Sequence, residues 1–159
     1  MTMPALDPRT NLSRKTTVLL AVTIAVGLLH HADHVLRVDH SGWPFRADVN
    51  PFTFSLLAYP ILLFALFGRR AAPWLRFAAV AFVTIATLAA HTLIETPRMQ
   101  YAMWALNHSI DPQEAHVQNA LHIASPEMGV TAMALSMTLN VLVVASTVAM
   151  AGAMWAARR

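Results

Sequence analysis

Residues 16–36 read TTVLLAVTIAVGLLHHADHVL, and this stretch decides the fold of the chain. Its first fourteen residues contain no charged side chain, and polar groups gather at its far end. A helix needs roughly 20 mostly apolar residues to cross the hydrocarbon core of a bilayer. The stretch therefore predicts a transmembrane helix with histidines near one membrane surface.

Three further apolar segments have the composition of membrane helices, and a proline opens each of them, as is typical of a first helical turn. Pro60 lies inside one segment and is expected to kink it. We expect an all-α integral membrane protein, a four-transmembrane-helix bundle that forms one membrane domain over residues 1–159. The four predicted spans are about residues 16–36, 51–67, 73–94 and 126–156.

The composition supports a membrane protein and excludes several other classes. Hydrophobic residues make up 57% of the chain and charged residues only 12%, whereas a soluble domain carries about 25% charged residues. The chain has no cysteine, which excludes disulfides, thiolate metal ligands and iron–sulfur clusters. The net charge is +3, but the basic residues sit at the ends of apolar runs, so we expect no nucleic-acid partner.

The basic residues predict the orientation in the membrane. Eight of the eleven lie on one side of the predicted spans, and three (Arg37, Arg46 and Arg98) lie on the other. The positive-inside rule then places both termini in the cytoplasm. Residues 14–29 resemble a signal peptide, but no cleavage motif follows, so we expect a retained helix. Length and alanine content are typical of a multi-pass protein of the bacterial inner membrane.

The segment 95–125 is the longest connection and is expected to form a short helical cap on the outer side, between the third and fourth spans. One short helix is predicted over residues 98–108. A capping-box pattern at Asp111 to Glu114 predicts a second one, ending near Ala124.

All eight histidines fall on the predicted outer side. His30, Asp33 and His34 share one face of the first span, and His91 and Glu95 share one face of the third, because their spacings are three and four residues. Ionisable groups inside a membrane are costly unless they face the interior of the bundle and are paired. The pattern therefore predicts a site in the outer half of the bundle.

Imidazole and carboxylate ligands without thiolate suit a divalent transition metal, and we favour zinc or iron. An open coordination position would allow a metal-dependent membrane enzyme acting on a lipid-soluble substrate. The cap and the start of the fourth span would add one ligand each. The predicted metal ligands are His30, Asp33, His34, His91, Glu95, His122 and Glu127.

Three alternatives stay open. His30 or His34 opposite His91 could ligate a haem b that exchanges electrons with quinone. The chain could instead be a non-enzymatic transport, sensing or assembly subunit whose histidines titrate near neutral pH. In the simplest interpretation, Asp33 pairs with Arg37 one turn along the helix and the site is structural. The sequence leaves the catalytic residues, the reaction and oligomerisation open.

Overall fold

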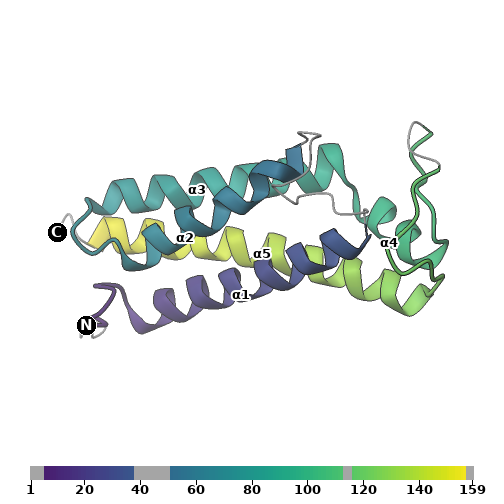
Figure 1. Cartoon of the computed structure of the whole chain (residues 1–159). Helices are drawn as coiled ribbons and strands as arrows, with labels where there is room; N and C mark the ends of the chain where they lie inside the picture. Colours follow the sequence, from purple (N-terminus) through teal and green to yellow (C-terminus); the bar gives the residue numbers. More distant parts are fainter. Residues whose placement is uncertain (1–5, 38–50, 113–115, 157–159) are drawn as a thin grey trace.

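The computed structural model describes residues 6–37, 51–112 and 116–156, with the backbone alone at 51–53 and 156. The long helices lie side by side along one axis, and α4 lies across one end of them (Figure 1). We call this end the cap end. The opposite end, which holds both termini and the α2–α3 connection, is the turn end. The elements are α1 (Arg14–Arg37), the 3-10 helix η1 (Pro51–Leu57), α2 (Ala58–Phe67), α3 (Pro73–Ala89), the π-helix η2 (Ala90–Ile94), α4 (Pro97–Ala105) and α5 (Pro126–Ala156).

Three helices are long and apolar enough to cross a membrane: Arg14–Arg37, Pro73–Ile94 and Pro126–Trp155. The second predicted span forms a shorter apolar helix, Phe54–Phe67. The prediction of an all-helical chain with membrane-length helices is therefore confirmed for the first, third and fourth spans. The described residues contain no strand, apart from one isolated bridge between Leu6 and Ser13.

The second apolar segment changes helix type along its length. It is a 3-10 helix up to Leu57 and an α-helix from Ala58. Pro60 has no N–H and clashes with the carbonyl of residue 56, so the α-helical hydrogen bond between these two positions cannot form. The predicted effect of Pro60 is thus seen as the tighter 3-10 helix η1, which directly precedes α2.

The third span ends in a π turn. The backbone N–H of Glu95 donates to the carbonyl of Ala90 at 2.8 Å, and Glu95 itself is extended, with φ −133° and ψ 92°. His91 and Glu95 therefore do not keep the α-helical i, i+4 relation that their spacing predicts. Both side chains are nevertheless buried, because the wider turn and the extended residue still direct them towards α1.

The cap contains one of its two predicted helices. α4 starts after Thr96, whose side chain accepts the N–H of Met99, and it matches the prediction for residues 98–108. The second prediction is wrong over residues 116–124, which form irregular chain and turns, while residues 113–115 lie outside the described part. The buried Asn119 side chain explains the difference, because its amide donates to the carbonyls of Met103 and Ile123 and holds the chain in a non-helical path.

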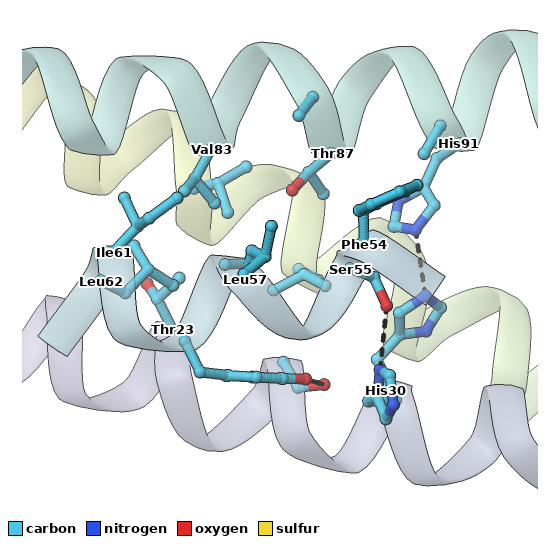
Figure 2. Close-up of a pocket in the computed structure, with 18 of the residues that line it drawn as sticks. Thr23, His30, Phe54, Ser55, Leu57, Ile61, Leu62, Val83, Thr87 and His91 are labelled. Carbon is cyan, nitrogen blue, oxygen red and sulfur yellow. Dashed lines mark hydrogen bonds between the residues drawn. The ribbon is translucent and has the colours of Figure 1, made fainter. Parts of the chain in front are cut away.

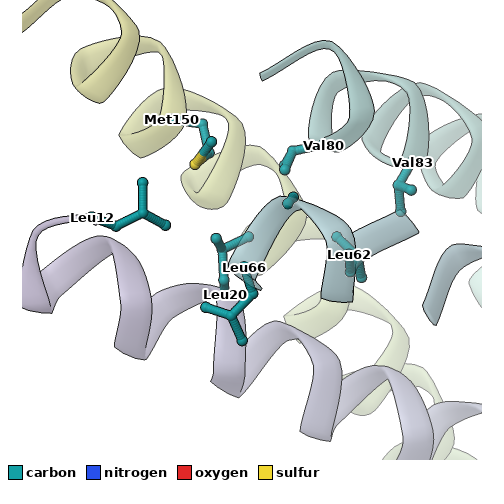
Figure 3. Close-up of a cluster of buried hydrophobic side chains, with 8 residues drawn as sticks. Leu12, Leu20, Leu62, Leu66, Val80, Val83 and Met150 are labelled. Atoms are coloured by element: carbon teal, nitrogen blue, oxygen red, sulfur yellow. The ribbon is translucent and has the colours of Figure 1, made fainter. Parts of the chain in front are cut away.

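The apolar core lies towards the turn end, where α1, α2, α3 and α5 meet (Figure 3). Leu20, Val80 and Ala65 are completely buried there. Nearer the middle of the bundle, side-chain hydrogen bonds join the helices. Thr23 of α1 contacts Ser146 at 2.8 Å, and Thr84 of α3 contacts Thr147 at 2.7 Å. Such interhelical bonds contribute about 0.6 kcal/mol each in a membrane protein.

Candidate functional site

His30 of α1 and His91 of η2 face each other near the cap end. Their Nε2 atoms are 3.0 Å apart, and only 6% and 5% of the two residues is exposed. His91 Nδ1 lies 2.7 Å from Oδ1 of Asn140 on α5. An amide oxygen can only accept, so His91 Nδ1 carries a proton. In a neutral His91, Nε2 then accepts from His30 Nε2–H, which leaves His30 Nδ1 as an acceptor.

Two imidazole nitrogens of this region are buried without a hydrogen-bond partner in the described part of the chain. They are His30 Nδ1 and His31 Nε2. The other nitrogen of His31 lies 3.3 Å from Ser55 Oγ on η1. A buried polar atom without a partner costs about 1–3 kcal/mol, and most such atoms in proteins are satisfied by protein, water or ligand. The two nitrogens are therefore positions where a bound molecule can gain hydrogen bonds.

The histidines form one end of a chamber of about 290 Å³ between α1, η1–α2, α3 and α5. Figure 2 shows His30 and His91 at this end, and Ile61, Leu62 and Val83 at the other. Most of the lining is apolar, and Tyr59 is already satisfied because its hydroxyl donates to the carbonyl of Gly27 at 3.0 Å. The chamber thus combines an apolar body with a polar end.

A second polar group lies beside the chamber and centres on Arg37, which is completely buried. Its Nε donates to Asp33 Oδ2 at 2.9 Å, and its Nη1 contacts Glu95 Oε1. The other oxygen of Glu95 lies 2.8 Å from His34 Nε2. The indole N–H of Trp104 donates to Asp33 Oδ1 at 2.8 Å. One guanidinium therefore binds carboxylates from two segments, which are far apart in the sequence.

The cap covers this ion-pair network. Trp104 is 1% exposed, and its carbonyl accepts the N–H of Ser125 at 2.7 Å. The N–H of Ala120 donates to the carbonyl of Leu36, at the end of α1, at 2.8 Å. The fully buried Gln100 donates to the carbonyl of Glu95 at 3.3 Å. The network is consequently separated from solvent at the cap end.

The structure brings together five of the seven residues singled out in the sequence: His30, Asp33, His34, His91 and Glu95. It does not bring the other two into this cluster. His122 is exposed and its Nδ1 lies 3.1 Å from Gln118 Oε1. Glu127 is exposed and accepts from Ser125 at 2.9 Å. His122 lies in the part of the cap where the predicted second helix is absent, and Glu127 lies in the first turn of α5.

Three residues of the site were not predicted as site residues. Arg37 was expected to be a local partner of Asp33, and that contact exists, but its contact with Glu95 depends on tertiary structure. Asn140 is a polar residue inside the apolar fourth span, and this is the signal that could have identified it. Trp104 lies in the predicted short helix over residues 98–108, and no local pattern indicates that its indole binds Asp33.

The geometry favours hydrogen bonding over metal chelation. In the described part of the chain, no three histidine, aspartate or glutamate side chains form a group that could hold a metal ion. Arg37 lies against both Asp33 and Glu95, so a cation bound to these carboxylates would be repelled by the guanidinium. Comparisons of the chain with models of protein families, with curated proteins and with solved structures found no match.

Proposed function

We propose that this chain is a four-span membrane protein with both termini in the cytoplasm, and that its chamber binds a lipid-soluble molecule with a hydroxyl-bearing head. The observation that carries the proposal is His30 Nδ1, a hydrogen-bond acceptor that is buried and has no partner among the described residues. His30 lines the apolar chamber. The eight-to-three distribution of basic residues supports the orientation.

The chemistry of the lining defines the ligand class. An apolar wall favours a hydrocarbon or aromatic body, and a bare imidazole nitrogen favours a group that donates a hydrogen bond. A hydroxyl on a lipid-soluble body meets both requirements. Quinols and long-chain alcohols belong to this class.

The ligand would reach the chamber from the lipid phase. Phe54 and Leu57 of η1 and Phe82 of α3 line the chamber, yet they are 59%, 56% and 63% exposed. Large exposed apolar side chains on the apolar helices of a membrane bundle are expected to face lipid. The same three side chains thus border both the lipid and the chamber, which makes a lateral path between η1–α2 and α3 the natural route.

Binding of a short-tailed benzoquinol to the full chain in nanodiscs tests the proposal, with its dimethyl ether as the matched probe. The quinol should bind at least about tenfold more tightly, because the ether cannot donate to a buried acceptor. Ala86→Phe should weaken quinol binding by filling the chamber that Ala86 lines. Ala78→Phe is the matched control, since Ala78 is an exposed residue of the same helix outside the lining. Equal binding of the two probes, or equal effects of the two variants, would contradict the proposal.

A metal centre is the second candidate, and one observation favours it. Zinc–imidazole bonds are about 2.0–2.1 Å, so two imidazoles on one tetrahedral ion have nitrogens roughly 3.3 Å apart. The observed His30–His91 separation of 3.0 Å is close to that value. The remaining ligands would come from water or a bound molecule. Elemental analysis of the purified chain decides this candidate, and a stoichiometry near zero with stability unchanged by chelators counts against it.

Two further candidates are a haem protein and a non-enzymatic subunit, and measurements on the same purified chain distinguish them. Axial imidazoles on opposite faces of a haem iron have nitrogens roughly 4 Å apart, judged from comparable metal–nitrogen bond lengths. The two helices would have to separate before a haem could enter between His30 and His91. An absorbance spectrum without a Soret band excludes haem, and binding of the quinol without turnover indicates a transport, sensing or assembly role.

A further inference from the structure

The turn end of the molecule carries a second pocket, far from the histidines. It has a volume of about 730 Å³ and is lined by one residue of the N-terminal segment and six of the α2–α3 turn region. The lining residues are Asn11, Phe64, Phe67, Gly68, Arg69, Arg70 and Ala71. From this composition we infer a binding site for the head group of an anionic phospholipid.

No ion pair among the described residues compensates the positive charge of the pocket. Arg69 and Arg70 are exposed, and the ion pairs among the described residues all lie at the cap end. Figure 1 places the N-terminal segment, the start of α1, the α2–α3 connection and the start of α3 at the turn end. The described residues of these segments include six basic residues and one acidic residue, Asp7. The basic residues are Arg9, Arg14, Lys15, Arg69, Arg70 and Arg76. A phosphate group therefore meets two guanidinium groups there, with little opposing charge.

The backbone holds these arginines in one place. Gly68 ends α2 by donating to the carbonyl of Phe64 at 2.8 Å, and Ala71 donates back to Gly68 at 2.9 Å. A Cβ at Gly68 would lie 2.5 Å from the Phe64 carbonyl oxygen, so a side chain does not fit without a shift. α3 then begins without a side-chain cap and without an acidic residue in its first turn. Its N-terminal dipole adds to the attraction for an anion.

The apolar side of the pocket indicates a lipid instead of free phosphate. Phe64 and Phe67 are 38% and 57% exposed and lie in the last turns of the apolar α2. An acyl chain can pack on these rings while the head group contacts Arg69 and Arg70. Basic pockets at the cytoplasmic ends of transmembrane helices bind anionic head groups in this way.

The test uses the full chain in phosphatidylcholine nanodiscs that contain a small fraction of phosphatidylglycerol, with native mass spectrometry of the lipid that the protein retains. The wild type should retain phosphatidylglycerol selectively. The double substitution Arg69→Gln/Arg70→Gln should lower its affinity on the order of tenfold or more. The control Arg14→Gln/Lys15→Gln removes the same charge outside the pocket and should have a much smaller effect.

The other outcomes overturn the inference. Equal losses in the two double variants would indicate general attraction to a basic surface. Displacement of the lipid by inorganic phosphate alone would indicate a phosphate site. No selectivity over phosphatidylcholine would mean that the pocket binds no anionic head group. The substituted side chains are exposed, so folding should be preserved, and an unchanged Tm of the purified variants provides the check.

Discussion

Arg37→Met should lower the stability of the protein strongly, since it removes the cation that lies between the buried carboxylate of Glu95 and the partly buried carboxylate of Asp33. Arg37 is 0% exposed and contacts both Asp33 and Glu95. Methionine has a similar length but no charge. Removing one partner of a buried ion pair costs about 3–5 kcal/mol, because the other charge is left without compensation. In the variant, the Trp104 indole still donates a hydrogen bond to Asp33. We therefore expect the free energy of unfolding to fall by about 3–5 kcal/mol and not by more.

Thermal unfolding of the detergent-purified chain, followed by tryptophan fluorescence, measures this effect. For a domain of this length, 1 kcal/mol corresponds to a shift of about 2–4 °C, so Tm should fall by roughly 6–20 °C. Arg98→Met is the matched control, because Arg98 is an exposed residue of α4. Its Tm should change little.

A double substitution tests the cause. Adding Glu95→Gln to Arg37→Met removes one of the two carboxylates that lose their ion pair with Arg37, and it should recover part of the lost stability. The coupling between the two substitutions should exceed about 1 kcal/mol, as is usual for contacting residues in one network. If Arg37→Met costs no more than Arg98→Met, or if the two substitutions at the site are simply additive, the reasoning about the buried network is refuted.

Two further predictions concern helix packing. Gly129→Ala should destabilise by about 1–3 kcal/mol, because its Cβ would lie 2.8 Å from the ring and the carbonyl of Tyr101, whereas Gly152→Ala, with nothing within 4 Å, should stabilise slightly in the same unfolding assay. Thr84→Val should cost about 0.6 kcal/mol through loss of its bond to Thr147. A smaller effect for Gly129→Ala than for Gly152→Ala would contradict the packing argument, and a neutral Thr84→Val would show that the bond contributes nothing.

The helix positions could be predicted from the sequence, because a long apolar run has few alternatives in a membrane. Helical spacing also brought His30, Asp33 and His34 onto one face, and the structure directs all three into the site region. These successes depend on local periodicity. They required no knowledge of how the helices pack.

The parts that could not be predicted depend on tertiary contacts. No residue in AHTLI at positions 90–94 indicates a π turn. The predicted α-helical i, i+4 relation between His91 and Glu95 was therefore wrong in detail. The cap was misjudged because the buried Asn119 amide donates to the carbonyls of Met103 and Ile123, and no local sequence pattern indicates these contacts. Arg37 has one local partner and one distant partner, and the sequence pattern indicates only the local one.

The pairing of Asp33 with Arg37 also bears on how the proposed membrane protein would insert into a bilayer during synthesis. When α1 leaves the ribosome, neither His91 nor Glu95 has yet been made. An isolated carboxylate and an isolated guanidinium near the end of a new span would each oppose insertion. One helical turn apart, they neutralise each other within α1. As the proposed first span, α1 would therefore enter a bilayer with its charges already paired, and Glu95 would later contact an arginine that already has a partner.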